Sequence, residues 1–260
     1  MSVLDKFQLN GQVAIVTGGG RGLGKAIARG FAEAGANVVI PDVKGKLAHE
    51  TADKLEELNV KTLGLKTDVT KEDQVRQMVE TTIEEMGQID ILMNNAGITK
   101  LKATKELSKE EFQKVIEVNL TGVFLCSREV GKYMIDSRTD GKIINMSSMS
   151  SFIANYPQKQ MAYNVSKAGV TMMTKALASE WVQHGIRVNE IAPGYMATEM
   201  TKDFFEEDPE RTQRYYIGGT PMERPGEPDE LAGVAVFLGS DASSYMTGAT
   251  VRVDGGYTIR

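Results

Sequence analysis

Tyr163 and Lys167 stand four positions apart, and Ser148 lies fifteen residues before Tyr163. A four-residue step on a helix places two side chains on the same face. A tyrosine hydroxyl beside a lysine ammonium can exchange a proton with a carbinol or carbonyl oxygen, and a serine hydroxyl can orient that oxygen. The three residues predict acid/base chemistry on an alcohol or ketone, although the Tyr-Lys spacing alone arises readily by chance.

A glycine-rich segment, Thr17-Gly-Gly-Gly-Arg-Gly-Leu-Gly24, follows a short β-branched run and opens an amphipathic one. Glycines in this context allow a tight turn and bring backbone N–H groups close to the phosphates of a dinucleotide. The spacing is Thr-Gly-x-x-x-Gly-x-Gly rather than Gly-x-Gly-x-x-Gly. The segment predicts a pyrophosphate site whose cofactor contacts come from Gly18, Arg21, Gly22, Leu23 and Gly24.

Asp42 ends the next expected strand, eighteen residues past Gly24. A carboxylate there can accept hydrogen bonds from the adenosine ribose hydroxyls, whereas a 2′-phosphate would meet a like charge at a cost of about 1 to 4 kcal/mol. Arg21 favours the opposite choice, because a guanidinium within the turn can bind such a phosphate. We expect NAD as the cofactor, with NADP as the less favoured alternative.

Short β-branched runs alternate with longer amphipathic ones along the whole chain. Strands are expected at 13–16, 37–40, 62–67, 89–93, 142–146, 187–191 and 249–253. Helices are expected at 21–34, 44–58, 72–86, 108–133, 158–183 and 229–238. This alternation implies right-handed crossovers and a parallel sheet with helices on both faces. We therefore expect one domain over residues 1–260, a doubly wound (Rossmann-type) α/β three-layer sandwich that binds ligands at the carboxyl ends of its strands.

The segment 198–219 keeps neither the helical nor the strand period. It carries Phe204, Phe205, Tyr215 and Tyr216 among many charged residues. Irregular segments of this length in a compact domain are often functional. We expect this one to form a lid over the substrate pocket.

The composition excludes several classes of protein. A hydrophobic fraction of 41%, a charged fraction of 25% and a net charge of −5 describe a globular protein with a full-sized core and no nucleic-acid partner. The apolar stretches are too short for a bilayer span and the N-terminus lacks a signal-peptide pattern, which predicts no membrane partner and a cytoplasmic location. Cys126 is expected to be a buried small hydrophobe. The isolated His49 and His184 offer no metal-ligand spacing, so no metal is expected.

Five motifs occur in order along nearly the whole chain: Thr17-Gly-x-x-x-Gly22-x-Gly24, Asn94-Asn-Ala-Gly97, Ser148, Tyr163-x-x-x-Lys167 and Pro193-Gly194. With these motifs the sequence resembles the short-chain dehydrogenase/reductase family. The resemblance implies an NAD(P)-dependent oxidoreductase that acts on CH–OH groups of a small molecule and assembles as a homotetramer. The long expected helices 108–133 and 158–183 are also rich in apolar and small residues, as helices paired between subunits would be.

The same resemblance assigns roles by position. For catalysis it makes Tyr163 the acid/base, Lys167 the ligand of the nicotinamide ribose, Ser148 the ligand of the carbonyl oxygen and Asn119 the anchor of a proton-relay water. For the cofactor it places Asp68 and Val69 at the adenine, Asn95 near the adenine-side ribose, Gly97 in the cofactor groove, and Met196 and Thr198 at the carboxamide.

A tyrosine that acts as a base near neutral pH needs a lowered pKa. Its ordinary pKa of about 10 would have to fall by about two to three units. Lys167 and the positively charged nicotinamide ring could supply this together, because a nearby opposite charge favours the phenolate.

The choice of catalytic serine has rivals. Ser150 has the thirteen-residue spacing to Tyr163 that is more usual in the family, and Ser147 and Ser151 are also close. We prefer Ser148 because it follows the expected strand by two residues, and a two-residue insertion in the loop 150–160 explains the longer gap. The Ser-Met-Ser and Asn-Tyr-Pro-Gln segments of this region resemble those of the family's sugar-alcohol dehydrogenases.

The expected activity is NAD-dependent interconversion of a secondary alcohol of a polyol or sugar with its ketone. A 3-oxoacyl-(acyl-carrier-protein) reductase is the alternative, because the same catalytic residues would serve it. A non-catalytic NAD-binding sensor or scaffold is a further alternative, which the complete set of Ser148, Tyr163, Lys167 and Asn119 disfavours.

Overall fold

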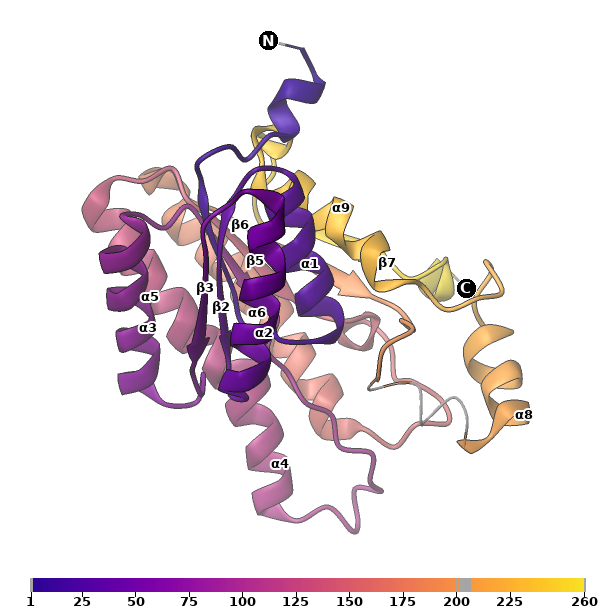
Figure 1. The fold of residues 1–260 in the computed structure, drawn as a ribbon. Coiled ribbons are helices and arrows are strands. Elements are labelled where there is room, and N and C mark those ends of the chain that lie inside the picture. Colours follow the sequence, from indigo (N-terminus) through magenta and orange to yellow (C-terminus); the bar gives the residue numbers. More distant parts are fainter. Residues whose placement is uncertain (1, 200, 202–206, 260) are drawn as a thin grey trace.

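Seven parallel strands form one sheet at the centre of the molecule (Figure 1). The computed structural model describes residues 2–199, 201 and 207–259. The sheet order is β3-β2-β1-β4-β5-β6-β7. The strands are β1 (Val13–Val16), β2 (Asn37–Asp42), β3 (Thr62–Lys66), β4 (Ile91–Asn94), β5 (Lys142–Met146), β6 (Arg187–Pro193) and β7 (Thr250–Val253). All neighbouring strands pair in parallel, which confirms the expected doubly wound sheet.

Helices cover both faces of this sheet (Figure 1). On one face lie α1 (Gly22–Glu33), α2 (Gly45–Leu55) and α9 (Pro228–Gly239). On the other lie α3 (Glu72–Met86), α5 (Gly122–Ser137) and α6 (Met161–Trp181). The short helices α4 (Lys109–Ile116) and α8 (Pro209–Arg211) lie outside these layers, near the carboxyl ends of the strands.

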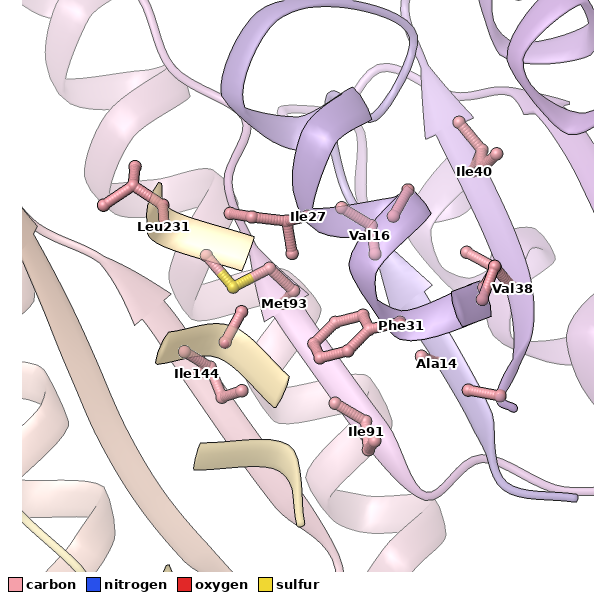
Figure 2. Packing of buried hydrophobic residues seen from close by; sticks show 14 of the residues in the cluster. Ala14, Val16, Ile27, Phe31, Val38, Ile40, Ile91, Met93, Ile144 and Leu231 are labelled. Atoms are coloured by element: carbon pink, nitrogen blue, oxygen red, sulfur yellow. The ribbon is translucent and has the colours of Figure 1, made fainter. Parts of the chain in front are cut away.

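Alternating side chains on each strand enter two separate cores, as the period of two in a β-strand requires. From β1, Ala14 and Val16 join the core under α1, α2 and α9, while Val13 and Ile15 join the core under α3, α5 and α6. Figure 2 shows the first core, where Phe31 of α1 lies over the sheet. The strands are apolar on both faces because both faces are covered.

The crevice for a ligand follows from the strand order. The chain moves outward from β1 to β3, then returns to place β4 on the other side of β1. The loops after β1 and β4 therefore diverge, and an open α/β sheet binds ligands at this point. The glycine-rich turn and the Asn94–Gly97 segment lie on either side of it.

The expected helix over 108–133 is wrong as a single continuous element. It begins at Lys109 with a capping box, in which Ser108 accepts from the Glu111 N–H, and a π-helical segment, Glu117–Thr121, separates α4 from α5. A widened turn of this kind inside a helix often marks a functional site. It brings Asn119, which is fully buried, to the edge of the crevice.

The expected lid is more regular than its sequence indicates. Its described part contains α8 and a π-helical segment, Thr212–Ile217, and Tyr216 is fully buried against Tyr195 with ring centroids 4.9 Å apart. Phe204 and Phe205 lie outside the described residues. A lid function for this segment stays a prediction.

Three further observations concern the described residues alone. None of their helices is long and apolar enough to cross a membrane. No group of three or more of their His, Cys, Asp or Glu side chains is arranged to hold a metal ion. Cys126 is buried in the core, as expected.

Candidate active site

Tyr163 and Lys167 project from the first turns of α6 toward the carboxyl end of β5. The lysine side chain is 3% exposed, and its Nζ donates to the Met146 carbonyl oxygen at 2.7 Å. The same Nζ lies 5.7 Å from the centroid of the Tyr163 ring. Helical spacing and the end of β5 thus hold the expected pair together.

Burial shapes the protonation of both groups. It lowers the pKa of Lys167 to about 8, and the negative charge of Glu190 opposes this shift. Burial raises the pKa of Tyr163, and a hydrogen bond with Ser148 opposes that rise. The structure therefore shows no lowering of the Tyr163 pKa by burial, and the expected role of Tyr163 as a base, with help from the charge of a bound cofactor, stays a prediction.

The four serines after β5 have different partners. Ser148 is the one that contacts the Tyr163 hydroxyl. Ser150 Oγ accepts from Gln160 Nε2 at 3.2 Å, and Ser147 Oγ donates to the Ile191 carbonyl oxygen at 3.2 Å. Ser151 Oγ is buried without a hydrogen-bond partner among the described residues.

Asn119 fastens the loop after β4 to α6. Its Oδ1 accepts from the Ile98 N–H at 2.8 Å, and its Nδ2 donates to the Ile98 carbonyl oxygen at 2.9 Å and to Ser166 Oγ at 3.1 Å. All three contacts hold the π-helical segment against its surroundings. The Asn119 side chain is thereby committed to protein atoms, and its role as a water anchor stays a prediction.

The glycine-rich turn has the close approaches that require glycine. Gly18 has a φ of +65°, and a Cβ added there would lie 2.9 Å from the Cα of Ala96. A Cβ at Gly24 would collide with the Gly18 carbonyl oxygen and the Asn95 amide. A Cβ at Gly22 would meet nothing within 4 Å, so this turn leaves open space for a ligand.

Asn95 holds the turn from the opposite side of the crevice. Its Nδ2 donates to the carbonyl oxygens of Thr17 at 3.0 Å and Gly18 at 3.1 Å. Thr17 Oγ1 accepts in return from the N–H groups of Asn95 at 3.0 Å and Ala96 at 3.1 Å. Asn95 therefore positions the glycine-rich turn, a role that was not predicted from the sequence. Its expected contact with the adenine-side ribose stays a prediction.

Asp42 lies at the end of β2, beside the turn. Its Oδ2 accepts from the Gly20 N–H at 3.2 Å and its Oδ1 from the Lys44 N–H at 2.9 Å. The two backbone donors fix the carboxylate at the crevice. Arg21 lies nearby, so a carboxylate and a cationic side chain both border the same part of the cavity.

One cavity of about 670 Å³ joins the glycine-rich turn to the Tyr163–Lys167 pair. Most of the expected site residues line it: Gly18, Arg21, Gly22, Leu23, Gly24, Asp42, Asp68, Val69, Asn95, Gly97, Tyr163, Lys167 and Thr198. Ser148, Asn119 and Met196 are not in its wall. Ser148 reaches the site through Tyr163, Asn119 lies behind Gly97, and Met196 is 4% exposed beside Gly226.

Sequence reasoning missed other residues of this wall: Val43, Lys44, Thr67, Thr70, Ala96, Ile98, Lys114, Glu117, Val118, Met146 and Glu199. Most of them directly follow strands or belong to the loop after β4. Their positions just past strand ends were a usable signal, because ligands bind there in this architecture. Lys114, Glu117 and Val118 gave no such signal, since the break between α4 and α5 brings them to the cavity.

The arrangement fits a dinucleotide whose pyrophosphate lies at the α1 N-terminus and whose reactive end lies at Tyr163. Comparison with known proteins agrees. A family model described as enoyl-(acyl carrier protein) reductase matches residues 18–258. The chain belongs to the short-chain dehydrogenase/reductase family. Members of this family bind NAD or NADP, and this chain is accordingly an oxidoreductase acting on CH–OH groups.

Relatives within the short-chain dehydrogenase/reductase family carry different names. The chain is 41% identical to a galactitol 2-dehydrogenase of Rhizobium johnstonii over 264 residues, covering 99% of each protein. It is 39% identical to a 3-oxoacyl-(acyl-carrier-protein) reductase of Thermotoga maritima, covering 97% of this chain and 100% of that one.

Solved structures of family members have the same fold. A short-chain type dehydrogenase/reductase from Mycobacterium marinum has a TM-score of 0.95 and 40% identity, with 100% of both chains covered. A gluconate 5-dehydrogenase from Burkholderia cenocepacia, in complex with NADP and tartrate, has a TM-score of 0.94 and 37% identity over 100% of both chains.

Proposed function

We propose that this protein is an NAD-dependent dehydrogenase that interconverts a secondary alcohol of a polyol or sugar with the corresponding ketone. One observation carries the proposal. Ser148 and Lys167 converge on Tyr163 at the end of a cavity that begins at the glycine-rich turn and passes Asp42. A proton acceptor therefore lies where the reactive end of a dinucleotide would lie.

Each residue has a defined task in this proposal. Tyr163 takes the carbinol proton during oxidation and returns it during reduction. Ser148 donates to the substrate oxygen and so opposes the charge that develops on it. Lys167, held by the Met146 carbonyl, supplies positive charge that favours the phenolate. The nicotinamide, when bound, supplies the hydride acceptor or donor.

The expectation of a hydroxyl-rich substrate comes from the amide side chains between Ser148 and Tyr163, which hydrogen-bond to other side chains and lie outside the cavity wall. Gln160 Nε2 donates to Asn155 Oδ1 at 3.0 Å, and Gln158 Oε1 accepts from the Tyr195 hydroxyl at 2.9 Å. Amide side chains of this kind can donate to and accept from hydroxyl groups. The names of the galactitol and gluconate dehydrogenase relatives agree with such a substrate.

A substrate panel tests this function directly. With NAD, we expect NADH formation at 340 nm from one or more of galactitol, sorbitol, mannitol and arabitol, and lower rates with NADP. The specific alternative is 3-oxoacyl thioester reduction, favoured by the Thermotoga maritima relative. If every polyol is inert while NADPH reduces acetoacetyl thioesters, the proposed function is wrong.

The cofactor preference rests on the charge of Asp42. Replacing Asp42 by Asn keeps the shape and removes the repulsion toward a 2′-phosphate, worth about 1 to 4 kcal/mol. We expect the ratio of kcat/KM with NADP to kcat/KM with NAD to rise by about 5- to 1,000-fold. The matched control is Asp53→Asn, which removes an equal charge from an exposed position on α2. An unchanged ratio in Asp42→Asn would mean that Arg21 sets the preference.

We also propose that the chain forms a homotetramer through helices on the α5/α6 side of the sheet. Three apolar side chains on this side are exposed: Phe124 on α5 by 43%, and Val165 and Met172 on α6 by 47% and 63%. Exposed apolar side chains that lie on one side of a molecule can mark a contact between subunits. Light scattering is expected to give four times the 28.4 kDa chain mass. A monomeric mass would contradict the proposal. The cytoplasmic location expected from the sequence stays a prediction.

A further inference from the structure

A row of polar side chains in register crosses the four neighbouring strands β4, β5, β6 and β7. Asn94 on β4 pairs in register with Asn145 on β5, Asn145 with Glu190 on β6, and Glu190 with Thr250 on β7. Asn94, Asn145 and Glu190 are at most 2% exposed. Parallel strands covered on both faces are normally apolar at such positions, so this row needs a reason beyond packing.

Glu190 is the only carboxyl group in this row. Its Oε1 accepts from Thr250 Oγ1 at 2.7 Å and from Thr171 Oγ1 at 2.9 Å. Its Oε2 lies 3.4 Å from Thr174 Oγ1, whose shorter hydrogen bond goes to the Val170 carbonyl oxygen at 2.9 Å. The two hydroxyl donors on Oε1 suit a carboxylate, which can only accept hydrogen bonds.

The row is joined to the candidate catalytic pair through α6. Tyr163, Lys167, Thr171 and Thr174 follow one another at steps of four, four and three residues, so they share one helix face. The N-terminal part of this face carries Tyr163 and Lys167, and the part that follows carries Thr171 and Thr174, which contact Glu190. β5 adds a second link, because Asn145 pairs in register with Glu190 and is followed by Met146, whose carbonyl accepts from Lys167.

The charges around Glu190 and Lys167 are few. Toward Glu190, α6 presents Thr171 and Thr174, β7 presents Thr250, and the end of β5 presents Ser147, all uncharged. Around Lys167, the described contacts are the Tyr163 ring, the Met146 carbonyl and the charge of Glu190. Burial raises the pKa of Glu190, and the hydroxyl donors oppose that shift.

We propose that Glu190 is a positioning residue for the Tyr163–Lys167 pair, whose buried carboxylate keeps Lys167 charged during turnover. The inference rests on the proposed function, since it assumes that this pair performs the proton transfer. Glu190 is fully buried and is not part of the cavity wall. It acts through Lys167, and its negative charge sets the pH range over which the pair works.

The pH dependence of turnover in Glu190→Gln tests the inference. Removing a nearby negative charge makes loss of a proton from the coupled pair easier, whichever member loses it first. Both the rising limb of alcohol oxidation and the falling limb of ketone reduction should move to lower pH by about 0.5 to 1 unit. Limbs that coincide with those of the wild type would overturn the inference.

Glu190→Asp is the matched control, because it keeps the charge and shortens the side chain by one methylene. Its limbs should stay close to those of the wild type. A shift as large as that of Glu190→Gln would assign the effect to lost packing and would equally overturn the inference.

A stability measurement tests whether Glu190 is ionised, without relying on activity. Because its folded pKa is raised above the ordinary value of 4.5, the wild type should lose stability relative to Glu190→Gln as the pH rises through the interval between these two values, and no further above it. Urea titrations across the pH range measure this difference. If the difference in stability between the wild type and Glu190→Gln levels off below pH 7, Glu190 is ionised during turnover. If this difference still grows above pH 9, Glu190 is protonated during turnover and the inference is contradicted.

Tyr163→Phe separates failure of this inference from failure of the proposed function. If Tyr163→Phe is inactive and the pH limbs of Glu190→Gln do not move, the inference alone is wrong. If Tyr163→Phe keeps wild-type turnover, the proposed function of the pair is wrong, and the inference falls with it.

Discussion

Replacing Tyr163 by phenylalanine is expected to lower kcat for alcohol oxidation by about 10²- to 10⁴-fold, the usual contribution of a positioned acid/base. The substitution removes only the hydroxyl that contacts Ser148 and leaves the ring in place beside Lys167. The dissociation constant of NAD should change by less than about threefold, because the phosphate turn lies at the other end of the cavity. Steady-state rates and a fluorescence titration with NADH measure the two quantities.

The control for this variant is Tyr245→Phe, which removes a hydroxyl from a fully exposed tyrosine. Its kcat should match that of the wild type. Turnover in Tyr163→Phe within a few-fold of the wild-type value would contradict the proposed role. Loss of NAD binding together with loss of turnover would assign Tyr163 to the cofactor instead of to proton transfer.

The second large effect is expected at Gly24, where even one methyl group has no room. A Cβ there would collide with the Gly18 carbonyl oxygen and the Asn95 amide, and the carbonyl belongs to the turn itself. Gly24→Ala must therefore displace the turn, at a cost of about 1 to 3 kcal/mol in stability. A displaced turn loses backbone N–H contacts with the pyrophosphate, and a loss of about 1.4 to 2.8 kcal/mol would lower NAD affinity by about 10- to 100-fold.

Gly233→Ala provides the matched control. Gly233 lies inside α9, and a Cβ added there would meet nothing within 4 Å. The same substitution should leave NAD affinity unchanged and stabilise the protein by up to about 1 kcal/mol through helix propensity. Calorimetric titration with NAD and thermal melting compare the two variants. Unchanged NAD affinity in Gly24→Ala would show that the pyrophosphate does not bind at this turn.

The layers of the fold could be predicted because the local periodicity of apolar residues identifies the strands and helices that form them. The apolar runs of β1 and β5 and the amphipathic pattern of α1 identify these elements at nearly their observed bounds. The break in the helix at Glu117–Thr121 could not be predicted in this way. It is stabilised by contacts of Asn119 with Ile98 and Ser166, residues far apart in the sequence, and a single-residue pattern does not encode such contacts.

In the candidate site, too, local spacing could be predicted from the sequence, whereas contacts that depend on the folded loops could not. Sequence spacing places Tyr163 and Lys167 on one face because both lie on one helix. The choice between Ser148 and Ser150 depends on how the loop after β5 folds, which spacing does not determine. In the structure Ser148 contacts Tyr163, whereas Ser150 is hydrogen-bonded to Gln160, and this difference favours Ser148 as the substrate ligand.

The positioning role of Glu190 could not be predicted from the sequence, for a physical reason. Within Arg187–Pro193 it reads as one polar residue in a strand, and polar residues in strands usually face solvent. Its importance emerges only when the sheet register places it beside Asn145 and Thr250 and the packing of α6 places Thr171 over it. Long-range register of this kind is a property of the whole fold.

The proposed function requires that the wild-type protein oxidise a polyol with NAD. Its most direct test is the ratio of kcat/KM for the best polyol with NAD to kcat/KM for an acetoacetyl thioester with NADPH, measured on the same preparation. We expect NADH formation from at least one polyol and a ratio above about 10, a discrimination that a few polar contacts with the substrate can supply. NADPH-dependent thioester reduction without any polyol oxidation would contradict it.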